Sequence, residues 1–244
     1  TINRYIQGGD GDIESIVKIF SFPIYRTKQM EELILWMREY NSTASEGKKL
    51  RFYGFDMQNP ETSYDFLKSY CTSKGLTSAD EFDKNLDCIE KGEISVESAK
   101  AVMDFVTGLK EKIGDIDVAN ADDRDALFEL NTVRQSMETF TNSNESYYTL
   151  RDSDMAGNIE AVLDIEKKIG SGKLVIAAHD GHIAKIGNGY TSMGAVLSND
   201  LKDAYYSIGT DFWKVTDNIK VLEKKKRSIQ SFISADPLAA QARF

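Results

Sequence analysis

Hydrophobic residues recur every three or four positions over several long stretches of the chain, the spacing typical of amphipathic helices. The longest predicted helices run from Thr27 to about Ser42, with Thr27 as N-cap, from Asp122 to Phe140 and from Ser146 to Ile169. Shorter helical patterns cover 13–20, 64–70 and 193–201. Polar residues fill the positions between the apolar ones, so each helix is expected to bury one face and expose the other.

Three other stretches have the pattern of β-strands. Leu50–Asp56 alternates and is rich in aromatic residues, Leu174–Ala178 is a short apolar run that ends at a turn, and Ala204–Trp213 contains several aromatic and β-branched residues. Helical segments separate these stretches, an order that favours a parallel or mixed sheet. The sequence therefore predicts an α/β fold, with a central mostly parallel or mixed sheet flanked by helices.

The length of 244 residues suits one large domain, and we expect a single domain over residues 1–244. Within it, residues 77–118 carry short helical patterns interrupted by Gly92, Gly108 and Gly114, with a high density of charge. This segment is interpreted as a helical insertion that covers one side of the core.

Composition narrows the classes of partner. The formal net charge of −9 argues against a nucleic-acid-binding groove and favours neutral or cationic small molecules. No stretch reaches membrane-spanning length without a charge, so no membrane partner is expected. The first residues contain neither an initiating Met nor an apolar leader, which indicates a trimmed start and favours a cytoplasmic location. Cys71 and Cys88 lack the spacing of a zinc or redox motif and are expected to be free thiols. The oligomeric state is left open.

The chemistry is expected around His179 and His182, the two histidines of the chain. They follow the predicted strand 174–178, and the carboxyl ends of strands in an α/β sheet open onto the ligand crevice. An imidazole can act as general base on water, and a carboxylate can fix its tautomer. Asp56, at the end of another predicted strand, is the candidate carboxylate, and Arg151 could bind a carboxylate or stabilise an oxyanion. The alternatives are a structural role for the histidines, a helix-capping Asp56 and a surface ion pair for Arg151.

A second chemistry uses His179, His182 and Asp56 as ligands of a hydrolytic metal ion. The chain has no third histidine, and Cys71 and Cys88 lack the spacing of a metal motif, so carboxylates would have to complete the coordination. We therefore prefer the metal-free general base and expect neither a metal nor another cofactor.

Several groups of residues, in order along most of the chain outside 77–118, together resemble the erythromycin esterase family, which includes succinoglycan biosynthesis protein-like members. The groups are Tyr25-Arg26-Thr27 with Leu33, Trp36, Arg38, Tyr40 and Asn41; Phe52-Tyr53-Gly54-Phe55-Asp56; Arg151-Asp152 with Met155, Ala156 and Asn158; Ala178-His179-Asp180-Gly181-His182-Ile183-Ala184; and Met193-Gly194 with Leu197, followed by Tyr205-Tyr206-Ser207-Ile208-Gly209.

The resemblance implies an α/β fold and a bacterial hydrolase that cleaves a lactone or other ester with histidine-activated water and without a required metal. In this family such cleavage inactivates macrolide antibiotics and confers resistance, and an acidic protein suits the cationic amino sugar of a macrolide. By the same resemblance His179 and His182 match active-site histidines, and Asp56 and Arg151 match positions near the same cleft. The alternative is a non-catalytic or carbohydrate-binding relative in succinoglycan-type cell-surface polysaccharide biosynthesis.

Two departures from the family pattern concern the ends of the chain. The family's amino-terminal Gly-Glu-x-x-His type motif, which supplies a further active-site Glu and His, is absent from this sequence. Family members also continue past the position that corresponds to Phe244. The sequence therefore predicts truncation at the amino terminus and at the carboxyl terminus, with part of the active site outside these residues.

Overall fold

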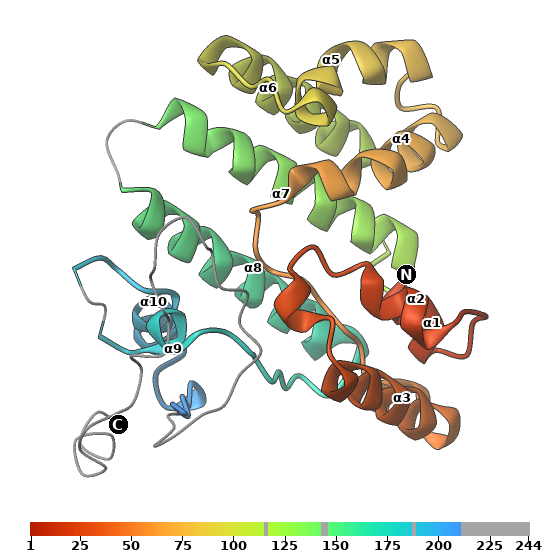
Figure 1. The fold of residues 1–244 in the computed structure, drawn as a ribbon, viewed down its shortest axis with the longest axis vertical. Coiled ribbons are helices and arrows are strands. Elements are labelled where there is room, and N and C mark those ends of the chain that lie inside the picture. Colours follow the sequence, from red (N-terminus) through yellow and green to blue (C-terminus); the bar gives the residue numbers. More distant parts are fainter. Residues whose placement is uncertain (115–116, 143–145, 187–188, 211–244) are drawn as a thin grey trace, which may run out of the picture. The chain divides into compact units, whose positions relative to one another are not determined.

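The structure, a computed structural model, describes residues 1–114, 117–142, 146–186 and 189–210. The chain divides into two compact units, residues 1–176 and residues 177–244. Every regular element in the described residues is a helix (Figure 1). The α-helices are α1 (Ile2–Ile6), α2 (Ile13–Lys18), α3 (Lys28–Thr43), α4 (Tyr64–Ser73), α5 (Ala79–Lys91), α6 (Val96–Ile113), α7 (Ala121–Thr141), α8 (Tyr147–Ile169), α9 (Asp180–Ile183) and α10 (Met193–Leu201), and the short 3₁₀ helices are η1 (Pro23–Tyr25), η2 (Glu46–Lys48), η3 (Pro60–Ser63) and η4 (Lys202–Ala204).

The larger hydrophobic core of the first unit lies among α4, α5, α6 and α7. Leu67, Phe82, Val106 and Leu130, one from each helix, are almost completely buried in it. A residue in the left-handed conformation, Gly92 with φ of +67°, ends α5 and turns the chain toward α6. Helices α5 and α6 fall within the segment 77–118, which the sequence indicated as helical; its interpretation as an insertion stays a prediction.

A second core joins α1 and α2 to α3. Ile6, Val17 and Ile34 are the buried residues at its centre, and Leu50 and Phe52 pack against it from the segment that follows α3. The side chain of Thr27 accepts a hydrogen bond from the Met30 amide at 3.2 Å, which confirms the predicted N-cap of α3. The apolar spacing of the long predicted helices is likewise confirmed in α3, α7 and α8.

The predicted α/β fold is wrong, because the described residues contain no strand and no sheet. Residues 51–57 and 173–179 form no regular element, and Val175 in the second stretch is fully exposed instead of buried. Of the third predicted strand, Ala204 ends η4, 205–210 form no regular element, and 211–213 lie outside the described residues. Alternating aromatic and β-branched residues suit a strand, but a strand also needs a neighbour for its backbone groups.

Along residues 50–55, side-chain amides of asparagines bind the backbone groups that a neighbouring strand would bind in a sheet. Asn41 accepts from the Leu50 amide at 2.7 Å and donates to the Leu50 carbonyl at 2.9 Å. Asn3 does the same at Phe52, with distances of 2.7 and 2.8 Å, and Asn158 donates to the Phe55 carbonyl at 2.9 Å. Buried backbone groups require a partner of some kind, and here helices α1, α3 and α8 supply it. The segment is thus fixed without being part of a sheet.

The second unit contains α9, α10 and η4. Ser192 caps α10 by accepting from the Ala195 amide, and its hydroxyl donates to the Ala184 carbonyl at 2.7 Å. The Tyr205 hydroxyl donates to the Ile183 carbonyl at 2.8 Å. A Cβ at Gly194 would overlap the Ile183 carbonyl, so the first turn of α10 lies against the end of α9 too closely for any larger residue. These contacts fix the short helix that carries the histidine pair.

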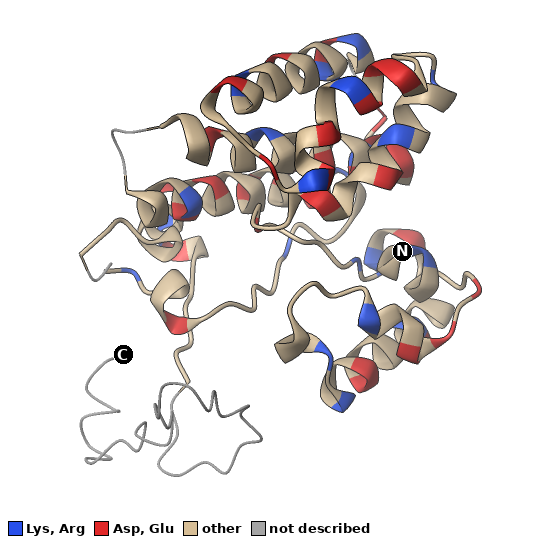
Figure 2. Cartoon of the chain, turned by 45° about the horizontal axis from the view of Figure 1, so that its top comes forward, with Lys and Arg blue, Asp and Glu red and all other residues tan. Residues whose placement is uncertain are grey.

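Acidic and basic residues are interspersed along the helices (Figure 2). Pairs such as Lys91 with Asp87 and Arg134 with Glu138 link positions one turn apart on the helix surfaces. None of the described helices combines the length and the apolar character that a membrane span requires. Cys71 and Cys88 are both free, as expected, with Cys71 buried and Cys88 partly buried.

Candidate functional site

Asp56 and Arg151 form a two-pronged ion pair in the first unit. Arg151 donates from Nε to Oδ1 of Asp56 at 2.9 Å and from Nη2 to Oδ2 at 2.7 Å. The side chains retain 13% and 28% exposure for Arg151 and Asp56, respectively, so the pair is partly shielded from water. A planar guanidinium matches a carboxylate in this geometry, which makes the pair stronger than a single-contact surface pair.

Three side chains of α8 contact residues 50–56, called the extended segment here, and Arg151 is the last of them. Glu166, Asn158 and Arg151 lie eight and seven residues apart on α8, about two helical turns in each case, and therefore share one face. Glu166 contacts the beginning of the segment, Asn158 the Phe55 carbonyl, and Arg151 contacts Asp56. The segment consequently runs along α8 in the opposite direction to the helix.

Glu166 binds the beginning of the extended segment through Arg51 and Tyr53. Its Oε1 accepts from the Tyr53 hydroxyl at 2.7 Å, and Nη1 of Arg51 lies 3.4 Å from both carboxylate oxygens. Burial and, after it, the hydrogen bond to Glu166 raise the pKa of the Tyr53 hydroxyl above its ordinary value. Glu166 is buried, and the positive charge of Arg51 compensates the carboxylate where water is largely excluded.

Electrostatics also favour the charged form of Arg151. Burial lowers the pKa of its guanidinium, but the hydrogen bonds and the charge of Asp56 outweigh burial, with smaller contributions from Tyr147 and Asp152. The net pKa is higher than the ordinary value for arginine. Because Asp56 occupies two of the guanidinium donors, the first role of Arg151 is to hold Asp56 and the end of the extended segment.

His179 and His182 lie on one short element of the second unit. His179 is the N-cap of α9, and its Nδ1 accepts a hydrogen bond from the Gly181 amide at 3.0 Å. The centroids of the two imidazole rings are 6.5 Å apart, with an interplanar angle of 78°. His179 is exposed and His182 partly buried. The predicted turn is therefore present as a helical turn, and it brings the two histidines together.

The hydrogen bond at Nδ1 determines which nitrogen of neutral His179 carries the proton. An imidazole nitrogen that accepts from an N–H has no proton of its own, so Nε2 is protonated in the neutral ring. Such a ring donates from Nε2 and accepts at Nδ1. The sequence suggested a general base, but a ring in this tautomer donates from Nε2 and is better suited to assist a second group that accepts the proton.

The four residues that the sequence proposed for the site lie in two pairs, Asp56 with Arg151 and His179 with His182; their role in a site stays a prediction. The sequence did not single out Glu166 or Tyr53, although the spacing of polar residues on α8 carries a signal. Arg151, Asn158 and Glu166 interrupt the apolar positions of that helix at intervals of about two turns. A buried polar face on a helix indicates a partner segment with exposed backbone groups, and the extended segment is that partner.

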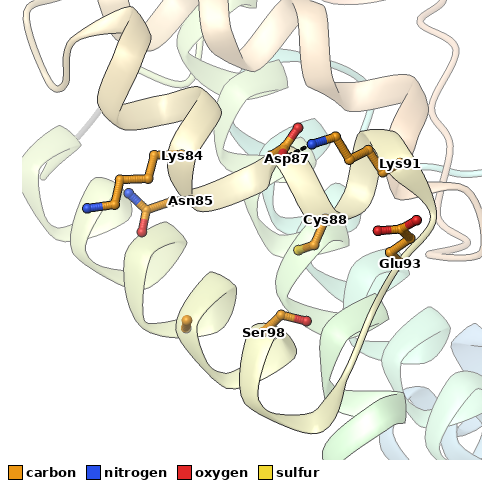
Figure 3. A pocket seen from close by; sticks show the side chains of 8 residues that line it. Lys84, Asn85, Asp87, Cys88, Lys91, Glu93 and Ser98 are labelled. Carbon is orange, nitrogen blue, oxygen red and sulfur yellow. Dashed lines mark hydrogen bonds and ion pairs between the residues drawn. The ribbon is translucent and has the colours of Figure 1, made fainter.

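No group of three or more His, Cys, Asp or Glu side chains with the geometry of a metal site occurs among the described residues. Hollows occur among the described residues of the first unit. One, of about 270 Å³, lies between α5 and α6, where Cys88 projects toward α6 beside the Lys91–Asp87 ion pair (Figure 3). Another, of about 260 Å³, begins at Met57, next to Asp56.

Comparisons with known proteins identify the family. The sequence model of the family described as erythromycin esterase matches residues 1–228. No curated protein matches the chain. A crystal structure of a protein from Bacillus cereus is similar, with a TM-score of 0.60 and 18% sequence identity over 86% of this chain. The match covers 54% of the Bacillus cereus chain, so the present chain spans about half of that protein's length.

The structural likeness concerns the fold alone, at this level of identity. The family match, in contrast, extends over nearly the whole sequence and includes both the Asp56–Arg151 pair and the histidine turn. The chain therefore belongs to the erythromycin esterase family.

Proposed function

We propose that the protein is a hydrolase that cleaves a carboxylic ester or lactone with a water molecule activated in the His179–His182 turn. The observation that carries the proposal is the histidine pair itself: His179 caps the four-residue helix α9 and His182 lies within it, and the exposed His179 is fixed by a backbone hydrogen bond. Family membership supports the same reaction class. A macrolide lactone is the first substrate to test.

The tautomer of His179 suggests a different catalytic role for each of the two imidazole rings. His179 donates from Nε2 to the ester carbonyl oxygen, where negative charge develops as water attacks. His182 takes the proton from the attacking water and returns it to the leaving alkoxide, which departs as an alcohol while the acyl group becomes a carboxylic acid. No covalent enzyme intermediate is required.

The Asp56–Arg151 pair is expected to support hydrolysis indirectly, by fixing the backbone of the first unit. Its bidentate geometry fixes the end of the extended segment and the direction of the chain from Met57 onward. We expect Asp56→Asn to keep one of the two hydrogen bonds and Asp56→Ala to lose both. The alternative roles that the sequence allowed, capping and a plain surface pair, predict no effect of either substitution on hydrolysis.

The proposal is tested with the full gene product that carries this chain, assayed on 4-nitrophenyl esters and on a macrolide lactone. Wild type is compared with His182→Gln and with Lys185→Ala, a control at an exposed position three residues further along the chain. We expect turnover by wild type and the control, and a loss on the order of 100-fold or more in His182→Gln, the range for a general base. Unchanged turnover in His182→Gln, or no turnover by wild type on any ester, would overturn the proposal.

A further inference from the structure

The hollow next to Asp56 has the composition of a small-molecule pocket. Its floor contains the buried residues Met57, Ile89 and Ser136, and its rim contains Phe140 and Tyr147, which are 45% and 43% exposed. Apolar walls with a few polar groups are typical of ligand pockets in proteins. All of these residues belong to the first unit, from the segment after Asp56 and from α5, α7 and α8.

Polar groups are placed at defined points of this pocket. The Gln58 side-chain amide donates to the Tyr147 hydroxyl at 3.0 Å, which holds the tyrosine at the rim. The Ser136 hydroxyl makes no hydrogen bond to the residues that the structure describes and is available to a ligand. Glu61 adds a carboxylate at the rim, and none of the described residues that line the pocket is a Lys or Arg. The lining therefore favours a neutral, hydroxyl-bearing ligand over an anion.

Size limits the ligand further. About 260 Å³ lies below the range of roughly 300–1,000 Å³ that holds drug-sized molecules, so the pocket accommodates a single ring. One wall is the turn after α5, where the left-handed Gly92 precedes Ile94. The segment 77–118 thus forms one wall of the pocket. The residues after Asp56, together with α7 and α8, form the opposite wall.

We infer that this pocket binds one glycosyl ring, either free or as part of a larger glycoside. The aromatic side chains of Phe140 and Tyr147 offer apolar faces to the C–H face of a pyranose, and Gln58, Glu61 and Ser136 offer donors and acceptors to its hydroxyl groups. Binding here requires no hydrolysis, so the inference goes beyond the proposed function and is tested separately from it.

The test is ligand-observed saturation-transfer NMR on the full chain, with methyl hexopyranosides as probes and phenol and cyclohexanol as rings without the sugar's hydroxyl pattern. The variant Phe140→Ala removes one aromatic face. Phe22→Ala is the matched control, because Phe22 is 41% exposed and does not line the pocket. Circular dichroism verifies that both variants keep the helical content of wild type.

We expect saturation transfer to at least one methyl hexopyranoside, unchanged in Phe22→Ala and with a dissociation constant about fivefold higher in Phe140→Ala. Gln58→Ala is expected to weaken binding as well, because it releases Tyr147. The inference is overturned if no methyl hexopyranoside binds, if Phe140→Ala binds as tightly as wild type, or if phenol or cyclohexanol binds more tightly than every glycoside.

Discussion

Replacing Asn158 by Ala tests how the extended segment is held against α8. Asn158 is 3% exposed and takes part in four hydrogen bonds. Its Oδ1 accepts from Asn131 at 2.9 Å and from Gln135 at 3.1 Å, and its Nδ2 donates to Gln135 Oε1 and to the Phe55 carbonyl, both at 2.9 Å. The substitution leaves these partners in a buried region without their bonds.

A typical hydrogen bond contributes about 1 kcal/mol net, and a buried group left unsatisfied costs about 1–3 kcal/mol. Four lost bonds, with some relief from water or from movement of Gln135, give an expected loss of about 3 kcal/mol in the free energy of unfolding. This is a large part of the roughly 5–15 kcal/mol that stabilises a typical domain.

Urea unfolding followed by circular dichroism measures this loss. The expected result for Asn158→Ala is a lower midpoint with an unchanged denaturant slope, since the surface exposed on unfolding stays the same. Asn85→Ala is the control, because Asn85 donates one solvent-facing bond, to the Glu81 carbonyl, and should change stability by about 0.5 kcal/mol or less. A loss under about 1 kcal/mol for Asn158→Ala, or one equal to the control, would show that these four hydrogen bonds do not hold the extended segment.

Three further predictions concern other parts of the chain. Gly194→Ala places a methyl group in the Ile183 carbonyl, so amide hydrogen exchange across α9 should become faster; unchanged exchange would contradict the close approach. Burial raises the pKa of the Cys71 thiol to about 11, so a thiol reagent at about pH 8 should modify Cys88 in the folded protein and Cys71 only after unfolding, as read by peptide mass spectrometry; equal reactivity would be inconsistent with this burial. Burial also raises the pKa of Glu129 in the folded state, so the folded protein binds the proton more tightly than the unfolded chain, and this contribution to stability falls as pH rises from the unfolded value through the folded one. Glu129→Gln should therefore remove part of the pH dependence of the melting temperature and gain stability relative to wild type at neutral pH; a lower melting temperature at neutral pH would argue against it.

Local helix signals were readable from the sequence, because they depend on neighbouring residues. The cap at Thr27 and the apolar spacing of α7 and α8 are properties of a few turns. The sheet was predicted from residue types that suit strands, yet a strand is defined by a partner that lies far away in sequence. At Leu50 and Phe52 that partner is the amide of Asn41 and of Asn3, which no local pattern announces.

In the candidate site, too, the residues could be predicted from the sequence but their contacts could not. Asp56, Arg151 and the two histidines were identified from residue type, position and family resemblance. Their pairing was not, because the contact between Asp56 and Arg151 joins residues 95 positions apart in sequence. The role of His179 depends on a hydrogen bond at Nδ1, which only the helical conformation of residues 180–183 provides.

The chemical role of His179 is tested most directly by the rate of ester hydrolysis in His179→Asn compared with His179→Ala. Asparagine is a good N-cap and can replace the hydrogen bond to the Gly181 amide, whereas alanine loses both the cap and the imidazole. If His179 acts chemically, kcat should fall in both variants, by about 100-fold or more, although His179→Asn keeps the stability of wild type. Wild-type kcat in His179→Asn would show that the histidine serves only as a cap and would contradict a chemical role for it.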